Sequence, residues 1–201
     1  LAGHDVCGKA RTGSGKTLAF GLPMLAKITR AQPYKPRALV LVPTRELASQ
    51  IARSLAPLAQ VHRIRIAAIF GGVSINRHAG LLRQGVEIVI ATPGRLNDLL
   101  QRGDLTLDDT SLVVLDEADQ MADMGFLPQV ERILSRIPGE RQTLLFSATL
   151  DGDVDRLVKR YQTDPIFHEA IAEDEGVPTM EHRFIGVDAN ERVAVAAAIA
   201  A

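Results

Sequence analysis

The sequence has very little cysteine and no excess of charge, and both features exclude classes of protein. Its single cysteine, Cys7, cannot form a disulfide within the chain and is typical of a reducing compartment. The five histidines show no spacing typical of metal ligands, which argues against a His/Cys metal site. The formal net charge is −1, so the composition does not indicate a nucleic-acid-binding protein. Any interaction with nucleic acid must therefore depend on local motifs.

Long apolar runs are also absent from the sequence. No stretch reaches the ~20 residues that a membrane-spanning helix needs, and the N-terminus lacks the basic and apolar blocks of a signal peptide. Hydrophobic residues make up 46% and charged residues 23%, the proportions of a globular enzyme domain. We therefore expect a cytoplasmic protein that does not contact a membrane. Its 201 residues suffice for one large core and the beginning of a second domain.

Short β-rich runs alternate with helical patterns along the chain. The runs that we expect to form strands lie at residues 5–10, 38–43, 64–70, 86–92, 111–118 and 143–149. Several are continuously apolar, which is typical of strands buried on both faces of a parallel sheet. The alternation predicts an α/β fold with a central, mostly parallel sheet, right-handed crossovers and helices on both faces.

Three of the helical patterns carry apolar stripes, which we interpret as faces turned toward the core. The stripes consist of Leu18, Leu22 and Leu25; of Leu47, Ile51, Leu55 and Leu58; and of Val130, Ile133, Leu134 and Ile137.

Five motifs whose residue types are suited to binding or catalysis directly follow the apolar runs. They are "ARTGSGKT", "PTREL", "TPGR", "DEAD" and "SAT". Open α/β sheets bind their ligands at the carboxyl ends of the strands. We therefore expect all five motifs to meet at one edge of the sheet.

The stretch "ARTGSGKT" has the residues of a phosphate-binding loop. Gly13 and Gly15 permit a backbone whose N–H groups surround phosphates, and a helix N-terminus follows. Lys16 is placed for the β- and γ-phosphates and Thr17 for Mg²⁺. Ala10 stands where the strict pattern has its first glycine, but a small residue can also start the turn. A glycine-rich turn with an incidental lysine is the alternative, and the strand–loop–helix context argues against it.

Two acidic residues end the apolar run "LVVL". Asp116 at the strand tip is placed to hold Mg²⁺ opposite the phosphate loop, and Glu117 to orient or deprotonate an attacking water. Alone, the pair would fit a solvated acidic turn equally well. The "NKxD" motif of GTPases and the "LSGGQ" motif of transporter ATPases are absent, whereas phosphate transfer to a small molecule stays open.

Taken in order, these motifs resemble the first RecA-like domain of DEAD-box ATP-dependent RNA helicases. "ARTGSGKT" is similar to motif I, including its alanine, and "PTRELA" to motif Ia. "GG" at 71–72, "TPGR", "DEAD", "SAT" and "DMGF" also fit the family order. The similarity covers about residues 1–187. It implies a RecA-like P-loop NTPase fold, ATP and Mg²⁺ as cofactors, RNA as substrate, and ATP hydrolysis coupled to local separation of RNA duplexes.

The resemblance also implies roles for individual residues at the nucleotide. The catalytic residues would be Lys16, Asp116, Glu117, Ser147 and Thr149. The residues that bind ATP would be Ala10, Thr12, Gly13, Ser14, Gly15, Lys16, Thr17, Asp116, Glu117 and Asp119. Thr17 and Asp116 would hold Mg²⁺, the latter through water. Asp119 with Ser147 and Thr149 would couple the state of the nucleotide to closure of two RecA-like domains.

The same resemblance implies a second set of residues that contact RNA. These would be Pro43, Thr44, Arg45, Gly72, Thr92, Pro93, Gly94 and Arg95. Helix-start amides, hydroxyls and arginines hold a sugar–phosphate backbone without distinguishing bases, so binding should be sequence-independent and salt-sensitive. Taken singly, Arg45 and Arg95 also fit solvated arginines at helix starts, and "PTREL" fits a proline-initiated helix.

We expect three segments along the chain. Residues 1–172 would form the ATP-binding domain, without the upstream glutamine-bearing motif that recognises adenine in this family. Residues 173–180, within and after "EDEGVPT", would form a linker, and residues 181–201 would begin the second RecA-like domain. That domain supplies the arginine fingers of the family, so the chain alone should be nearly inactive.

The expected partners are RNA, the second RecA-like domain, and ribonucleoprotein particles or ribosome-assembly intermediates. An ATP-gated RNA clamp or remodelling scaffold that does not unwind is the alternative function. A DNA-acting relative is a third possibility.

Overall fold

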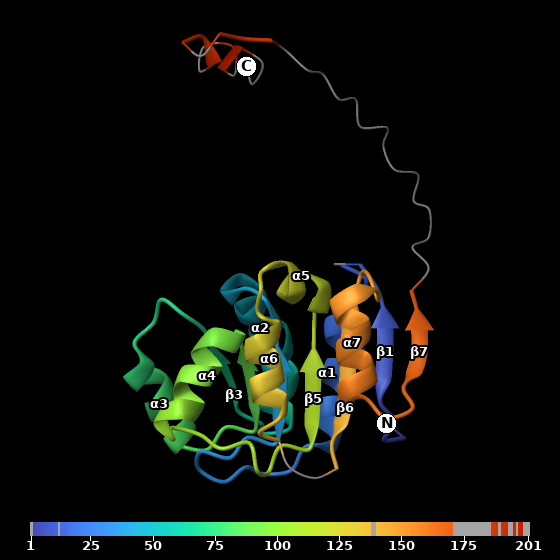
Figure 1. Cartoon of the computed structure of the whole chain (residues 1–201). Coiled ribbons are helices and arrows are strands. Elements are labelled where there is room, and N and C mark those ends of the chain that lie inside the picture. The colour runs from blue at the N-terminus through green and yellow to red at the C-terminus, as the bar shows by residue number, and fades with distance from the viewer. Residues whose placement is uncertain are drawn as a thin grey trace. The chain divides into compact units, whose positions relative to one another are not determined.

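A computed structural model of the chain describes most of the residues before residue 171 and few after it (Figure 1). The described residues are 2–11, 13–137, 140–170, 186–188, 190–192, 195 and 197–198. The chain divides into two compact units, Leu1–Ile171 and Ala172–Ala201. In the second unit the Val195 amide donates to the Glu191 carbonyl at 3.0 Å, as in a helix. The expected linker at 173–180 and much of the expected second domain lie outside the described residues.

The first unit is built on a seven-stranded parallel sheet. Its strands are β1 (Val6–Lys9), β2 (Ala38–Leu41), β3 (Ile66–Ile69), β4 (Ile88–Ala91), β5 (Leu112–Leu115), β6 (Gln142–Ser147) and β7 (Ile166–Glu169). They lie side by side in the order β3-β4-β2-β5-β6-β1-β7, and all six strand pairs are parallel. The predicted α/β class and all six predicted strands are confirmed. The sequence did not predict β7, because Ile166 and Phe167 are its only apolar residues and form neither an apolar run nor an alternation.

Helices cover both faces of the sheet (Figure 1). They are α1 (Lys16–Lys27), α2 (Arg45–Val61), α3 (Ile75–Arg83), α4 (Pro93–Arg102), α5 (Ala118–Asp123), α6 (Leu127–Leu134) and α7 (Gly152–Tyr161). Helices α1 and α2 pack on one face, and α3 to α7 on the other. No helix in the described part of the chain is long and apolar enough to cross a membrane.

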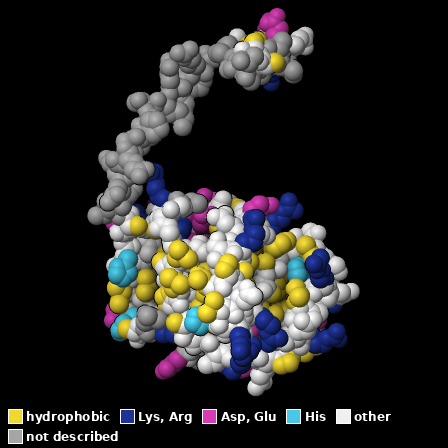
Figure 2. All heavy atoms as spheres, turned by 180° about the vertical axis from the view of Figure 1, so that it is seen from behind, with side chains coloured by type: hydrophobic (Ala, Val, Ile, Leu, Met, Phe, Trp, Pro, Cys, Tyr) yellow, Lys and Arg dark blue, Asp and Glu magenta, His cyan; other side chains and the backbone are white. Residues whose placement is uncertain are grey.

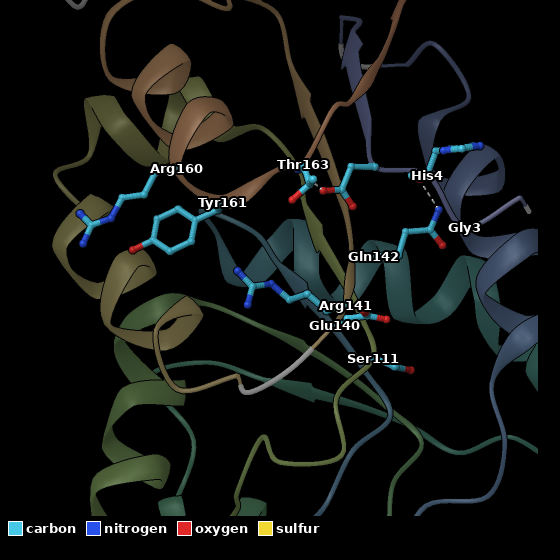
Figure 3. Close-up of a pocket in the computed structure, with 10 residues that line it drawn as sticks. Gly3, His4, Ser111, Glu140, Arg141, Gln142, Arg160, Tyr161 and Thr163 are labelled. Carbon is cyan, nitrogen blue, oxygen red and sulfur yellow. Dashed lines mark hydrogen bonds between the residues drawn. The ribbon is translucent and has the colours of Figure 1, made fainter.

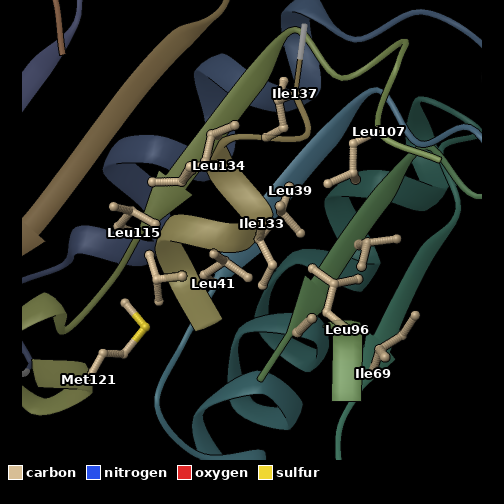
Figure 4. Packing of buried hydrophobic residues seen from close by; sticks show 14 of the residues in the cluster. Leu39, Leu41, Ile69, Leu96, Leu107, Leu115, Met121, Ile133, Leu134 and Ile137 are labelled. Carbon is tan, nitrogen blue, oxygen red and sulfur yellow. The ribbon is translucent and has the colours of Figure 1, made fainter. Parts of the chain in front are cut away.

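Strands β2, β4 and β5 are apolar and buried throughout, because each face of the sheet has its own core. Leu39 and Leu41 of β2 point toward α4 and α6, where they meet Leu96 and Ile133 (Figure 4). Val40, between them in the sequence, belongs to the core beneath α1 and α2. Successive side chains of a strand alternate between faces, so a sheet covered on both sides buries every residue.

Two of the three predicted helix stripes are confirmed, and the one on α1 is wrong except for Leu25, which is buried. The stripe residues of α2 and of the α6 region are buried or packed against the core. On α1, however, Leu18 and Leu22 are 50% and 51% exposed, and Phe20, Gly21 and Met24 face inward instead. Gly21 decides this orientation, because a Cβ there would lie 2.4 Å from a methyl group of Leu55 on α2. The missing side chain lets α1 approach α2 closely on that side.

Candidate nucleotide and RNA sites

The strand order places the predicted motifs along one edge of the sheet in two groups. The phosphate loop, "DEAD" and "SAT" follow β1, β5 and β6, which are adjacent strands. "PTREL", the "GG" turn and "TPGR" follow β2, β3 and β4, which are adjacent on the other side of β5. Since all the strands are parallel, their carboxyl ends share one edge. The first group forms a candidate nucleotide site and the second a candidate RNA site.

The phosphate loop depends on two glycines for its backbone. Gly13 and Gly15 have φ values of 86° and 82°, in the left-handed region that disfavours other residues. A Cβ at either position would meet no heavy atom within 4 Å, so backbone conformation rather than space requires glycine. Helix α1 begins directly afterwards, with no side-chain cap and no acidic residue in its first turn. Its N-terminal amides and dipole are therefore suited to an anion. Thr12 of the predicted set lies outside the described residues.

Lys16 joins the loop to the tip of β5. Its Nζ lies 3.3 Å from Asp116 Oδ1 and donates to the Ala10 carbonyl at 3.3 Å. Both side chains are almost fully buried. Burial raises the pKa of the Asp116 carboxyl, and the charge and hydrogen bond of Lys16 act in the opposite direction. Burial is the larger effect, so the pKa of Asp116 stays above its ordinary value despite the positive charge beside it.

Glu117 follows Asp116 in an unusual backbone conformation. Its φ and ψ are 55° and 53°, in the left-handed region, and its amide donates to Asp116 Oδ1 at 3.1 Å. Few residues other than glycine adopt this conformation, which costs free energy and is often found at functional sites. It ends β5 and starts α5, and Glu117 lines a pocket while Asp116 stays buried beneath.

This pocket of ≈ 210 Å³ lies among the phosphate loop, "DEAD" and "SAT". It is lined by Ala10, Lys16, Glu117, Asp119, Gln120, Asp123 and Ala148. Gln120 and Asp123 were not predicted. The sequence carried a signal for Asp123, because it lies four residues after Asp119 and so on the same side of a helix.

Asp119 connects the "DEAD" and "SAT" motifs. Its amide donates to Ser147 Oγ at 3.1 Å, and its Oδ2 accepts from the Ala148 amide at 3.1 Å. The Ser147 carbonyl accepts from the Ala10 amide at 2.9 Å, which links the same strand end to the phosphate loop. Thr149 lies beside this pocket, in an adjacent hollow that Asp119 also lines.

Two residues next in sequence to the pocket lining, Thr17 and Asp116, are of types that suit Mg²⁺. Mg²⁺ prefers oxygen ligands and keeps several waters, so a hydroxyl and one carboxylate suffice when phosphates supply the rest. Thr17 and Asp116 offer those two groups at the start of α1 and the end of β5. The described residues contain no cluster of three or more His, Cys, Asp or Glu side chains that could hold a metal by itself.

In the second group of motifs, Thr44 and Arg45 lie beside the "GG" turn. Thr44 caps α2, its Oγ1 accepting from the Leu47 amide at 3.2 Å. Arg45 is exposed, forms an ion pair with Glu46, and its Nη1 would lie 3.7 Å from a Cβ at Gly72. Gly72 has a φ of 82°. Two predicted RNA-binding segments thus meet here.

Arg95 is held against the same turn from α4. Its Nη1 donates to the Val73 carbonyl at 2.6 Å and lies 3.3 Å from His78 Nδ1, and its side chain is 15% exposed. Arg95 is therefore no solvated arginine at a helix start. Burial, together with the charges of Arg95 and Arg77, lowers the pKa of His78 and so favours its neutral ring, whose Nε2–H tautomer leaves Nδ1 to accept from Arg95. No spacing in the sequence pointed to His78.

The remaining predicted RNA-binding residues lie at the starts of the same helices. Pro93 occupies the first turn of α4 and Thr92 precedes it, while Gly94 follows. Pro43 precedes the Thr44 cap of α2.

A larger hollow of ≈ 700 Å³ lies where β1, β5 and β6 begin (Figure 3). Its lining includes His4, Arg141, Arg160 and Tyr161, and none of the predicted site residues. The amino ends of the strands are not where open α/β sheets bind their ligands.

A family model described as DEAD/DEAH box helicase matches residues 1–157. The chain belongs to this family. The resemblance drawn from the motifs is thereby confirmed, and DEAD-box relatives support it.

The chain is 41% identical over 187 residues to DEAD-box ATP-dependent RNA helicase CshA of Geobacillus kaustophilus, covering 93% of this chain and 40% of that protein. It is 46% identical over 180 residues to DEAD-box ATP-dependent RNA helicase 9 of Oryza sativa subsp. japonica, covering 87% and 28%. The chain thus spans less than half the length of these DEAD-box proteins.

Solved structures of DEAD-box proteins share the fold. The yeast DEAD-box splicing factor Prp28 is similar with a TM-score of 0.79 and 35% identity, over 85% of this chain and 42% of that one. A hypothetical ATP-dependent RNA helicase from Sulfolobus tokodaii is similar with a TM-score of 0.76 and 35% identity, over 84% and 48%. The first unit therefore has the RecA-like fold of DEAD-box proteins.

Proposed function

We propose that residues 1–172 are the ATP-binding domain of an ATP-dependent RNA helicase that separates short RNA duplexes locally. The observation that carries this proposal is the connection of three motifs around one pocket. Lys16 of the phosphate loop pairs with Asp116, and Asp119 is hydrogen-bonded to the end of β6. Both DEAD-box relatives named above are called ATP-dependent RNA helicases.

ATP would bind with its phosphates in the loop at the start of α1. Lys16 and Thr17 lie in the first turn of α1, where the amides at the N-terminus of a helix suit an anion, and Lys16 supplies a positive charge. Thr17 and Asp116 would hold Mg²⁺, which would supply positive charge to offset the negative charge that develops on the phosphates during transfer. Ala10 and Ser14 complete the set of residues at the phosphates.

Glu117 would act on the attacking water. Its left-handed backbone turns it away from the buried Asp116 and into the pocket. A carboxylate in this position can accept a proton from water or orient it for in-line attack. The different backbone conformations of the two residues thus explain why Asp116 would hold Mg²⁺ and Glu117 would act on water.

The bonds of Asp119 would transmit the state of the nucleotide. Its carboxylate accepts from the Ala148 amide and its amide donates to Ser147. A displacement of α5 would therefore also move the end of β6. Thr149 lies at this strand end and lines a hollow with Asp119. This link would couple the nucleotide to closure on a second RecA-like domain, whose first residues we place at 181–201.

RNA would bind along the neighbouring strand ends without base recognition. Arg45, Gly72 and the start of α4 offer the arginine, amides and hydroxyl that suit a sugar–phosphate backbone. Arg95 would act partly by holding the turn that contains Gly72, since its guanidinium is bonded to Val73. Binding of this kind weakens steeply with salt.

Exchange of Glu117 for Gln in the full-length protein tests the assigned chemistry. Glu117→Gln should retain ATP binding and lose RNA-stimulated ATP hydrolysis by about 10²–10⁴-fold, the usual contribution of a positioned acid or base. Phosphate release and binding of a fluorescent ATP analogue measure the two properties. Asp108→Asn, at an exposed carboxylate, is the matched control and should change neither. Unchanged turnover in Glu117→Gln would contradict the role of Glu117.

The same site would also serve an ATP-gated RNA clamp that holds RNA for a ribonucleoprotein partner. Strand displacement and RNA retention, measured side by side on the full-length protein, distinguish the two. Retention without displacement would replace the helicase proposal by the clamp. Stimulation by DNA as strong as by RNA would instead indicate a DNA-acting enzyme.

A further inference from the structure

The sheet ends at β3, and the outer side of this strand has no neighbouring strand among the described residues. The carbonyls of Arg65 and Ile69 accept hydrogen bonds from the β4 side. Because the residues of a parallel strand bond alternately to its two sides, the N–H and C=O groups of Ile66 and Ala68 point outward. An open strand edge of this kind is a template for pairing with another chain.

A groove of ≈ 750 Å³ runs beside this edge, between α2 and β3. Its walls are mostly apolar: Ala52, Ala56 and Ala59 of α2 lie opposite Ile66 and Ala68 of β3. The three alanines are spaced by four and three residues and so lie on one side of the helix. Their short side chains leave room for the side chains of an added segment.

The rim of the groove is strongly basic. Arg30, Arg53, Arg63 and Arg65 line it, and no acidic residue does. The buried Glu87 pairs with Arg30 at 3.6 Å and with Arg65 at 3.3 Å. Arg53 and Arg63 form no ion pair within the described residues. Figure 2 shows the face that carries α1 and α2, where Lys and Arg side chains lie around hydrophobic ones.

Three properties of the groove favour a polypeptide over RNA. A strand edge offers main-chain hydrogen bonds that an extended peptide can complete and a nucleic acid cannot. The walls are apolar, and no aromatic residue lines them on which a base could stack. The arginines then require acidic side chains on the peptide.

We propose that the open edge of β3 binds an extended, acidic segment of a partner protein, which adds to the sheet beside β3. Apolar side chains of the segment lie over the alanines of α2, and acidic ones pair with Arg53 and Arg63. The groove shares no residue with the nucleotide pocket or with the predicted RNA contacts. This surface is thus independent of the proposed ATPase and helicase activity.

A synthetic peptide of alternating Glu and Val, labelled with fluorescein, is the probe. Fluorescence anisotropy with the 201-residue chain should show saturable binding that weakens with salt. The double variant Arg53→Glu/Arg63→Glu should lower the affinity by about tenfold or more, because it replaces two attractions by repulsions. The control Arg132→Glu/Arg136→Glu makes the same charge change at exposed positions in and after α6, on the opposite face. It should bind like the original chain.

Peptides with methylated amide nitrogens test strand addition separately from charge. Methylation of the alternate amides that face β3 should abolish binding, and methylation of the other set should not. Amide hydrogen exchange, followed by NMR, should slow at Ile66 and Ala68 when the unmodified peptide binds.

Three results would overturn the proposal: no saturable binding, equal affinity of both methylated peptides, or equal affinity of the Arg53/Arg63 double variant. Loss of oligouridylate binding in that variant, with the peptide unaffected, would assign the groove to RNA instead. Thermal unfolding checks that the variants are folded. RNA-stimulated ATPase activity of the full-length protein should be the same with and without the double substitution. Failure of the peptide-binding proposal would therefore not contradict the helicase proposal.

Discussion

At the scale of single residues, glycine serves two different purposes in this domain. A Cβ at Gly8 would lie 2.6 Å from the Phe146 ring, and one at Gly21 would lie 2.4 Å from Leu55. These two glycines provide space in the core. Gly13 and Gly15 have open space around them but left-handed backbones, so they serve the phosphate loop.

Gly8→Ala should therefore destabilise the fold. The added methyl group meets Phe146, whose ring is itself packed on Phe20 with centroids 5.7 Å apart, so we expect a loss of about 1–3 kcal/mol. Urea unfolding followed by circular dichroism measures this. Gly80→Ala on α3 is the matched control. A Cβ at this position would meet no heavy atom within 4 Å, so the substitution should be neutral or stabilising by up to about 1 kcal/mol. Equal destabilisation of both variants would contradict the packing argument.

At the scale of elements, Glu87 ties the segment after α1 to β3 and β4. Its carboxylate accepts from the Arg65 amide at 2.7 Å and from the Ala31 amide at 3.3 Å. Burial by itself would raise the pKa of Glu87, but the hydrogen bonds from Arg65 and Ala31 outweigh it and hold the pKa below its ordinary value. The ionised carboxylate thus stabilises the native state.

The contribution of Glu87 should depend on pH in a defined direction. A carboxyl whose pKa is lowered by folding stabilises the protein above its unfolded pKa of 4.5 and loses this effect as the pH falls through the folded value. Glu87→Gln should cost about 1–3 kcal/mol near neutral pH, and the difference from the original chain should shrink below pH 4.5. Urea unfolding at several pH values measures it. The exposed Glu140→Gln is the control, and a Glu87→Gln deficit that stays constant down to pH 3 would refute the assignment.

His78 of α3, which contacts Arg95 of α4, should affect stability in the same direction as Glu87 but in a higher pH window. The charged groups that act on it are Arg95 and Arg77, and Phe70 packs edge-on against its ring. Because its folded pKa is lowered from 6.5, the unfolded chain takes up a proton first, and stability should fall as the pH decreases below 6.5. His78→Gln should remove this part of the pH dependence. Thermal unfolding from pH 7.5 to 5.5 tests it, and identical profiles of the two chains would disprove it.

The exposed apolar side chains of α1 and the strand β7 show where sequence patterns fail at this scale. Leu18 and Leu22 have helical spacing but point outward, because Gly21 permits a closer contact on another side of the helix. β7 pairs with β1 through its backbone while its side chains stay exposed. Hydrophobic periodicity cannot predict a strand that is held mainly by backbone hydrogen bonds.

At the scale of the whole molecule, strand order separates the two candidate sites. β1, β6 and β5 carry the nucleotide motifs, and β2, β4 and β3 carry the RNA motifs. β5 and β2 are adjacent, so the two groups share a boundary where "DEAD" follows one strand and "PTREL" the other. In the function proposed above, a change at the nucleotide would have to cross only one strand spacing to reach the RNA side.

The isolated chain should bind ATP but hydrolyse it very slowly. Arginine fingers, which the resemblance implies on a second RecA-like domain, contribute about 10³–10⁵ in rate. We expect turnover lower than in the full-length protein by about 10³-fold or more, with no stimulation by RNA. Mg²⁺–ATP should still raise the melting temperature, by the equivalent of about 2.7 kcal/mol at a hundredfold excess over Kd. Lys16→Ala is the control that should abolish this shift, and full RNA-stimulated turnover by the chain alone would contradict the expectation.

The sequence by itself determined the α/β class, six of the seven strands and the residues of the phosphate loop, because these depend on local periodicity and on backbone requirements of short motifs. The pairing of Lys16 with Asp116, the bonds of Asp119 to β6 and the support of Arg95 by His78 join residues far apart in the chain. Only the tertiary structure decided these, since strand order and helix packing set which loops meet. The same holds for the open edge of β3: no strand of the described residues lies beside it, and no local sequence pattern indicates which strand ends a sheet.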